Sequence, residues 1–141
     1  MSMDSAVVLF VSPYTQDAWV LQAMLRQVSI AVVHITSLKE AVSQMDAAWF
    51  PVVLTEAKLD DGGWRDLLRL TRLKGSELVV TDAFADARFW AEAINLGAFD
   101  VLAQPFHRTE VQRVLASAAS SHAASAQAAG GQGKLKAAAA R

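Results

Sequence analysis

Short apolar runs alternate along the chain with longer stretches in which apolar residues recur every three or four positions. The short runs are rich in Val, Leu and Ile and have the length of strands. Their continuous hydrophobicity is typical of strands that are buried on both faces. They predict strands over residues 6–11, 30–35, 51–55, 78–81 and 99–103.

The stretches between these runs have the spacing of amphipathic helices, as Val20, Leu21, Met24 and Leu25 illustrate. Helices are predicted over residues 15–28, 38–49, 64–73 and 86–96, with a fifth that begins near His107, Thr109 or Glu110. Five strand–helix repeats with short connections predict an α/β fold of the flavodoxin-like (βα)5 type. This fold is a three-layer sandwich around a five-stranded parallel sheet, with its site at the carboxyl ends of the strands.

Cap residues agree with these boundaries. Ser37 and Glu40 have the spacing of a capping box before the second helix, and Gly97 stands where the fourth helix should end. Beyond the fifth apolar helix the chain consists mostly of Ala, Ser, Gln and Gly. We therefore predict a domain over residues 1–118 and a tail over residues 119–141 that is either a fraying helix or disordered.

Composition narrows the range of functions. The chain has 141 residues, a formal net charge of −1 and no cysteine, so it lacks the basic character of nucleic-acid-binding domains and cannot form disulfides or zinc–thiolate sites. Its apolar runs are too short to cross a bilayer, and no export signal is evident. We expect a cytoplasmic protein that binds neither nucleic acid nor membrane and holds no metal or cofactor.

The junction at the end of the fifth strand carries the most specific signal. The sequence Gln104-Pro105-Phe106 follows that strand directly. It resembles the Lys-Pro-Phe signature of receiver domains, the response-regulator modules of two-component signalling, with the lysine replaced. The resemblance covers roughly residues 7–115 and implies a cis peptide bond before Pro105, which X-Pro bonds allow at low cost.

The resemblance also assigns roles to single positions. A phosphorylatable receiver needs two acidic residues after the first strand to hold magnesium, and here Ser12 and Pro13 take those places. Its nucleophilic aspartate, at the end of the third strand, corresponds to Glu56. An extra methylene displaces the glutamate carboxylate by about a bond length, which disturbs catalytic geometry.

Two further positions complete the expected site. The hydroxyl that ends the fourth strand in the family corresponds to Asp82, or to Thr81 if the register is shifted by one residue. Successive strand residues face opposite sides of the sheet, so we expect only one of these two to point at the site. The lysine position is Gln104, which can donate hydrogen bonds but carries no charge. These replacements imply that the phosphorylation chemistry is lost.

The loop after the third strand brings further carboxylates near this site. Glu56 and Asp82 should converge with Asp60 and Asp61 nearby, so that one carboxylate has a raised pKa unless Lys58, solvent or a bound cation relieves the repulsion. A shifted register with Asp60 or Asp61 as acceptor is rejected, because it would leave no room for the loop that closes the site.

Aromatic residues mark candidate contact surfaces. Trp90 is predicted to face the core, whereas Phe89 should lie on the other flank of the fourth helix. In the family, this helix with the fifth strand and fifth helix forms the surface that meets partners. The resemblance therefore implies that Phe89, Asp100 and Arg113 contact a partner.

Three functions follow from these observations. The leading hypothesis is a degenerate receiver that is not an enzyme and acts by binding a protein partner: a kinase, an output protein or a second copy in a weak homodimer. The first alternative is a conventional phospho-accepting response regulator with unusual site residues. The second is a small flavodoxin-like ligand-binding protein, although Ser12-Pro13-Tyr14 replaces the glycine-rich loop that a nucleotide site needs.

Overall fold

The computed structural model describes residues 6–130, with side chains for residues 6–121. The predicted strands are present, two of them with the predicted bounds and the others shifted by one residue at one or both ends. These strands are β1 (Ala6–Val11), β2 (Ile30–Ile35), β3 (Val52–Glu56), β6 (Glu77–Asp82) and β7 (Asp100–Ala103). Two short strands that were not predicted, β4 (Lys58–Leu59) and β5 (Gly62–Gly63), pair antiparallel in the loop after β3.

The predicted helices are present as well. The first ends in a turn of 3-10 helix, η2 (Arg26–Val28), and the second ends two residues before its predicted end. The α-helices are α1 (Thr15–Leu25), α2 (Leu38–Ala47), α3 (Trp64–Lys74), α4 (Ala87–Leu96) and α5 (Arg108–Gly130).

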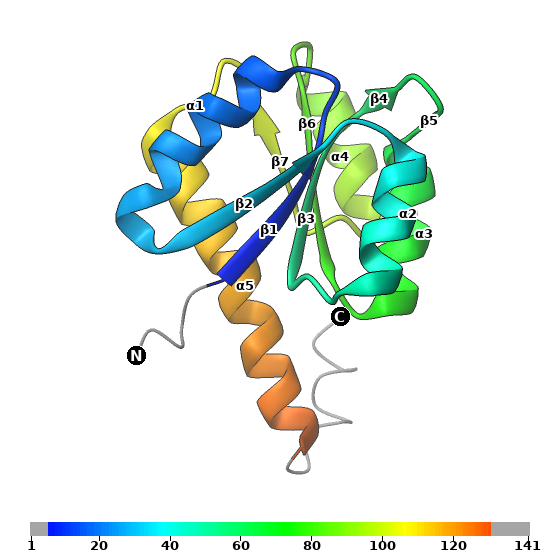
Figure 1. Ribbon diagram of the computed structural model, residues 1–141, viewed down its shortest axis with the longest axis vertical. Helices are drawn as coiled ribbons and strands as arrows, with labels where there is room; N and C mark the ends of the chain where they lie inside the picture. The colour runs from blue at the N-terminus through cyan, green and yellow to red at the C-terminus, as the bar shows by residue number, and fades with distance from the viewer. Residues whose placement is uncertain (1–5, 131–141) are drawn as a thin grey trace.

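The five long strands form one parallel sheet in the order β2-β1-β3-β6-β7, which confirms the flavodoxin-like fold (Figure 1). β1 lies between β2 and β3, so the order of the strands reverses there. Because the strands are parallel, their carboxyl ends lie at the same edge of the sheet, where residues from distant segments meet. The pairing brings Val11 beside Thr55 and Glu56 beside Thr81.

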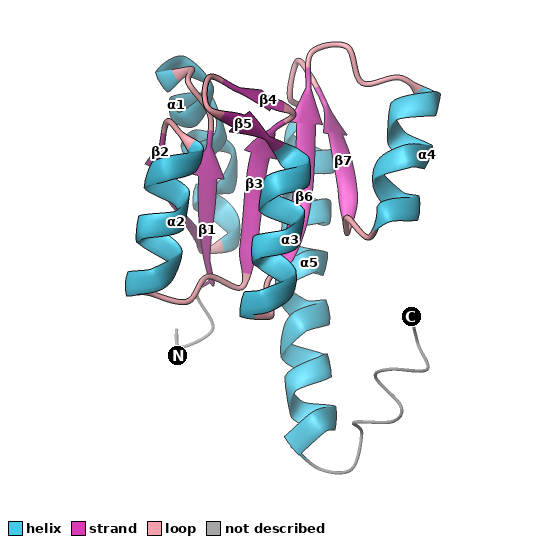
Figure 2. Ribbon diagram, turned by 90° about the vertical axis from the view of Figure 1, so that its right-hand side faces the viewer, coloured by secondary structure: helices cyan, strands magenta, loops and turns pink. Residues whose placement is uncertain are grey.

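Alternate strand residues supply two separate cores. In β1, Leu9 and Val11 pack with residues of α2, α3 and α4, whereas Val8 and Phe10 pack with residues of α1 and α5. Figure 2 shows α2 and α3 in front of the sheet and α5 behind it. Burial on both faces explains why these strands are continuously apolar.

Helix ends follow the predicted cap chemistry in most respects. The Ser37 hydroxyl accepts a hydrogen bond from the Glu40 backbone N–H at 3.1 Å, as the capping box predicts. The Glu40 carboxylate accepts hydrogen bonds chiefly from the N–H and hydroxyl of Thr36. Gly97 ends α4 with a φ of 118°, a conformation that side-chain-bearing residues rarely adopt.

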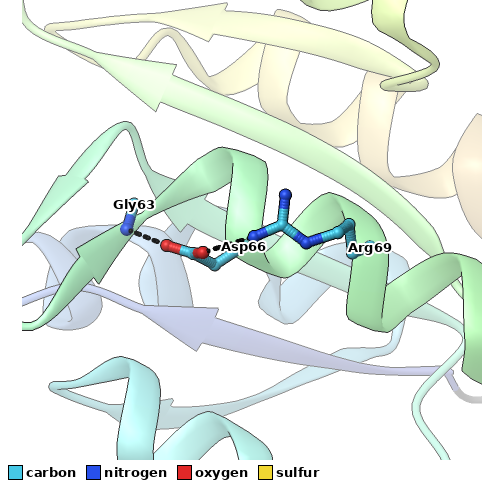
Figure 3. Close-up of polar contacts among 3 residues, drawn as sticks. All are labelled: Gly63, Asp66 and Arg69. Carbon is cyan, nitrogen blue, oxygen red and sulfur yellow. Dashed lines mark hydrogen bonds and ion pairs between the residues drawn. The ribbon is translucent and has the colours of Figure 1, made fainter.

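The start of α3 is fixed by a carboxylate one turn into the helix. The Asp66 carboxylate accepts a hydrogen bond from the Gly63 backbone N–H at 3.0 Å and pairs with Arg69 at 2.7 Å (Figure 3). It therefore satisfies a backbone donor that the first helical turn leaves without a partner.

Helix α5 continues beyond the sheet (Figures 1 and 2) and reaches Gly130. The predicted tail over residues 119–141 thus includes a helical part, and residues 131–141 lie outside the described residues. In the part of the chain that the structure describes, no helix has the length and hydropathy needed to span a membrane.

The aromatic side chains of α4 differ from expectation. Trp90 is 48% exposed, so the prediction that it belongs to the core was wrong, and Trp64 is buried. Phe89 is half-buried and packs edge-on against Trp64, with ring centroids 5.9 Å apart. Each helical residue advances the side chain by about 100°, so choosing the wrong neighbour as the inward residue exchanges core and surface.

Candidate functional site

The carboxyl ends of four strands meet at one edge of the sheet, where the strand arrows end in Figure 2. Ser12 follows β1, Glu56 ends β3, Thr81 lies near the end of β6 and Gln104 follows β7. Hydrogen bonds join these four side chains into one network. The sequence-predicted site residues are therefore brought together, with the exceptions described below.

Glu56 lies at the centre of this network and is only 5% exposed. Its Oε2 accepts a hydrogen bond from the Gln104 side-chain amide at 2.9 Å and a long one from the Ser12 hydroxyl at 3.5 Å. No described residue donates a hydrogen bond to the other carboxyl oxygen, Oε1. Both donors are neutral, and none of the ion pairs among the described residues includes Glu56.

Gln104 connects Glu56 to β6. Its amide nitrogen also contacts the Thr81 hydroxyl at 3.1 Å, and that hydroxyl donates to the Leu102 carbonyl at 2.8 Å. The peptide bond between Gln104 and Pro105 is cis, as predicted. A glutamine amide at this position can hold a carboxylate and a hydroxyl together but cannot neutralise the carboxylate.

The sequence left open whether Asp82 or Thr81 takes the hydroxyl position at the end of the fourth strand. Thr81 is completely buried under Gln104, whereas Asp82 ends β6 at the mouth of the site. The Asp82 carboxylate accepts a hydrogen bond from the Phe84 backbone N–H at 3.1 Å. Thr81 thus joins the hydrogen-bond network beneath Gln104, whereas Asp82 lines the cavity above Glu56.

A cavity of about 590 Å³ opens above Glu56. It contains one carboxylate that sequence reasoning missed, Asp17 in the first turn of α1. The signal could have been found, because the first turn of the helix after β1 lies at the same sheet edge. The lining residues are Tyr14, Gln16, Asp17, Glu56, Lys58, Asp82, Ala83, Phe84 and Gln104.

This setting perturbs the Glu56 carboxyl. Burial raises the pKa of Glu56 above its ordinary value of 4.5, because the charged form loses hydration. The Asp17 and Asp82 carboxylates raise this pKa further by repulsion, and the hydrogen bonds from Gln104 and Ser12 oppose them. The predicted convergence of Glu56 and Asp82 is thus present, with Asp17 as an additional contributor.

Ser12 stabilises the loop after β1. Its hydroxyl accepts a hydrogen bond from the Tyr14 backbone N–H at 3.0 Å, and its carbonyl accepts one from His34 Nε2 at 2.8 Å. Sequence reasoning assigned no role to His34. Pro13 offers no side-chain oxygen, so the two residues that follow β1 supply one neutral hydroxyl that is already hydrogen-bonded.

The loop carboxylates turn away from Glu56. Asp61 accepts hydrogen bonds from the backbone N–H groups of Leu38 and Lys39 at 2.8 and 2.9 Å, so it caps α2. These bonds lower the pKa of Asp61 below its ordinary value of 3.8. Asp60 is exposed and does not line the cavity, whereas Lys58 does, without forming an ion pair with a described residue.

The described side chains include no group of three or more His, Cys, Asp or Glu residues arranged to hold a metal ion. Asp17, Glu56 and Asp82 share the cavity but do not form such a group. The arrangement can hold a buried carboxyl group in hydrogen bonds with neutral donors.

The surface that was expected to contact a partner is formed by α4, β7 and α5. Asp100 accepts a hydrogen bond from Trp90 Nε1 at 3.2 Å, and both line a second cavity of about 390 Å³ with Glu110 and Arg113. Phe89 faces Trp64 instead, so Trp90 is the exposed aromatic residue of this surface.

No protein-family model matches the chain, and no curated protein matches it. Solved structures do. A signal receiver domain from Vibrio parahaemolyticus superposes with a TM-score of 0.81 at 16% identity, covering 87% of this chain and 96% of that one.

Two further structures agree with this result. A signal receiver domain of an HD domain-containing protein from Pseudomonas fluorescens gives a TM-score of 0.74 at 19% identity, with 85% and 98% coverage of the two chains. The beryllofluoride-activated NtrC4 receiver domain dimer gives 0.75 at 20% identity, with 82% and 98% coverage. At these identities the likeness concerns architecture: the chain has the flavodoxin-like fold found in response-regulator receiver domains.

Proposed function

We propose that the chain is a receiver-like signalling module that is not phosphorylated at this site and acts by binding a protein partner. The fold supports the receiver part of this proposal. One observation carries the rest: at the end of β3 stands a buried glutamate held by two neutral donors, Ser12 and Gln104.

The chemistry of phosphoryl transfer explains why this observation matters. An incoming phosphoryl group carries negative charge, which a magnesium ion and a lysine would neutralise. Here Pro13 and Gln104 replace acidic and cationic groups, and Asp17 and Asp82 add negative charge to the cavity. A phosphate anion would therefore meet repulsion with little compensation, since Lys58 is the one cationic residue among those lining it.

Phosphorylation can be tested directly with acetyl phosphate and magnesium, followed by intact-mass spectrometry. We expect no stoichiometric gain of a phosphoryl group, while a conventional receiver domain treated in parallel gains one. A gain that disappears in E56Q would instead establish the first alternative, a phospho-accepting regulator with unusual residues. A gain that persists in E56Q would place the modification elsewhere.

The partner surface follows from the arrangement around β7. Trp90 is exposed beside Asp100, Glu110 and Arg113, so an apolar ring lies next to charges of both signs. Exposed aromatic residues and arginines contribute most strongly to protein interfaces. We assign this surface to a kinase, an output protein or a second copy, and the NtrC4 receiver, a dimer in its solved structure, shows that this fold can self-associate.

A small-ligand function remains as the second candidate because the cavity above Glu56 has a volume of about 590 Å³. The absorption spectrum of the purified protein separates the two: a retained flavin or nucleotide would add bands that the protein's own aromatic residues do not produce. We expect no such bands.

A further inference from the structure

Glu56 differs from an ordinary buried acid in how its charge is supported. It is 5% exposed, yet Gln104 and Ser12, its hydrogen-bond donors among the described residues, are neutral. A buried carboxylate without a cation binds a proton more readily than one in water. The Glu56 carboxyl therefore gains its proton at a higher pH than an exposed glutamate does.

Charged and titratable groups face Glu56 from several elements. Asp17 approaches from α1 and Asp82 from β6, while Lys58 in the loop after β3 and the Tyr14 hydroxyl line the same cavity. Asp17 and Asp82 both favour the protonated form of Glu56, and burial acts in the same direction and more strongly. Of these neighbours, only Lys58 carries positive charge at neutral pH.

The proton also changes what Glu56 can hold. An ionised carboxylate accepts a stronger hydrogen bond from an amide than a neutral carboxyl group does. The Gln104 amide spans Glu56 Oε2 at 2.9 Å and the Thr81 hydroxyl at 3.1 Å, and its side chain also lines the cavity. The position of the Gln104 amide between Glu56 and Thr81 therefore depends on the charge of Glu56. The cavity beside Gln104 leaves space into which the amide can move.

We propose that Glu56 is the input of a proton-operated switch, in which the ionised carboxylate holds the Gln104 amide across the site to Thr81 and protonation releases that amide toward the cavity. The proton adds to Oε1, which accepts no hydrogen bond from a described residue, and it comes from solvent through the cavity that Glu56 lines. No other covalent bond forms or breaks.

The switch has a path to the rest of the fold. Gln104 precedes Pro105 and Phe106, and the Phe106 ring packs edge-on against Phe10, with centroids 6.4 Å apart. Helix α5 begins two residues later at Arg108. A change at Gln104 therefore acts on the segment that connects β7 to α5, next to the proposed partner surface.

Nuclear magnetic resonance can follow both ends of the switch in the intact protein. Carbon-13 signals report the Glu56 carboxyl, and nitrogen-15 signals report the Gln104 side-chain amide. We expect the Glu56 midpoint to lie above 4.5 and the Gln104 amide signal to shift with that same midpoint. In E56Q the pH dependence of the Gln104 amide should be lost.

Two aspartates, one at the end of β6 and one at the start of α4, provide a matched comparison. Asp82 caps the Phe84 N–H and faces Glu56, whereas Asp86 caps the Phe89 N–H and does not line this cavity. D82N should therefore lower the Glu56 midpoint, and D86N should leave it unchanged. Gln112, whose amide donates to the Met24 carbonyl, is an internal control whose signal should not follow Glu56.

The proposal is overturned if Glu56 titrates at or below 4.5, or if the Gln104 amide keeps its signal while Glu56 titrates. Wild-type and D82N spectra are sufficient for this decision, so it does not depend on whether E56Q folds. The switch rests on the proposed function, since it takes the place of phosphorylation at the same site. The two fail separately: a phosphoryl gain in the mass experiment refutes the proposed function, whereas the titration alone refutes the switch.

Discussion

At the residue scale, the site depends on how few donors the Glu56 carboxyl has. Gln104 donates one good hydrogen bond, and the Ser12 hydroxyl donates a long one. A glutamine in place of Glu56 would keep the shape of the side chain while removing the buried charge. The substitution therefore separates the structural role of the residue from its ionisation.

The pH dependence of stability follows from the raised pKa of Glu56. The folded state holds this proton more tightly than the unfolded state, so the stabilisation is complete below 4.5 and is lost as pH rises through the folded-state pKa. E56Q lacks this loss. We predict that the free energy of unfolding of E56Q, measured by urea denaturation, exceeds that of the wild type increasingly as pH rises through this window.

Glu40 provides a control with the opposite sign. Hydrogen bonds from Thr36 lower its pKa below 4.5, so its contribution is present above the unfolded pKa and is lost as pH falls through the folded one. E40Q should therefore be less stable than the wild type near neutral pH, with the difference closing in acid. Equal pH profiles for E56Q and the wild type would contradict the account of Glu56.

At the element scale, loops and helix caps connect the secondary-structure elements around the site. The β4–β5 hairpin joins the end of β3 to α3, and its Asp61 caps α2. The pairing Lys58–Gly63 was not evident from the sequence because strands this short have no apolar pattern. The role of Asp61 depends on Leu38, 23 residues away, which no local motif connects to it.

Two glycines that end helices give a matched prediction. Gly75 and Gly97 both have positive φ, but a Cβ at Gly75 would meet no atom within 4 Å, whereas one at Gly97 would collide with the Arg72 guanidinium. G75A should cost about 1 kcal/mol from backbone strain alone. G97A should cost more, because its φ of 118° lies further from the left-handed region and because the Arg72 guanidinium must move. The double variant R72A/G97A should recover the second part of this excess relative to R72A.

Urea denaturation of the four variants measures these differences. If G97A and G75A were equally destabilised, the close approach of Arg72 would be unimportant. Arg72 also contacts the Leu96 carbonyl, so R72A alone is needed as the reference for the double variant.

At the scale of the whole molecule, the two helical layers present different surfaces. Trp90 on α4 lies beside the cavity formed with β7 and α5, and Trp19 is exposed on α1 in the opposite layer. Because the two tryptophans are both exposed and occupy separate layers, their replacement distinguishes a specific interface from general surface hydrophobicity.

We predict that W90A weakens self-association or partner binding about tenfold, while W19A leaves it unchanged. A concentration series followed by light scattering measures self-association. R113E should act in the same direction as W90A, because Arg113 lines the same cavity. A loss confined to W19A would move the interface to α1.

The amino-acid sequence by itself determined the alternation of strands and helices, because apolar periodicity is a local property that burial on one or two faces imposes. It also determined that Ser12, Pro13 and Gln104, which directly follow two of the predicted strands, are neutral. The tertiary structure alone decided the strand order, the approach of Asp17 to Glu56, and the exchange of Phe89 and Trp90 between surface and core. These features depend on how distant segments meet at one sheet edge and on the rotation of each helix, and local patterns leave both open.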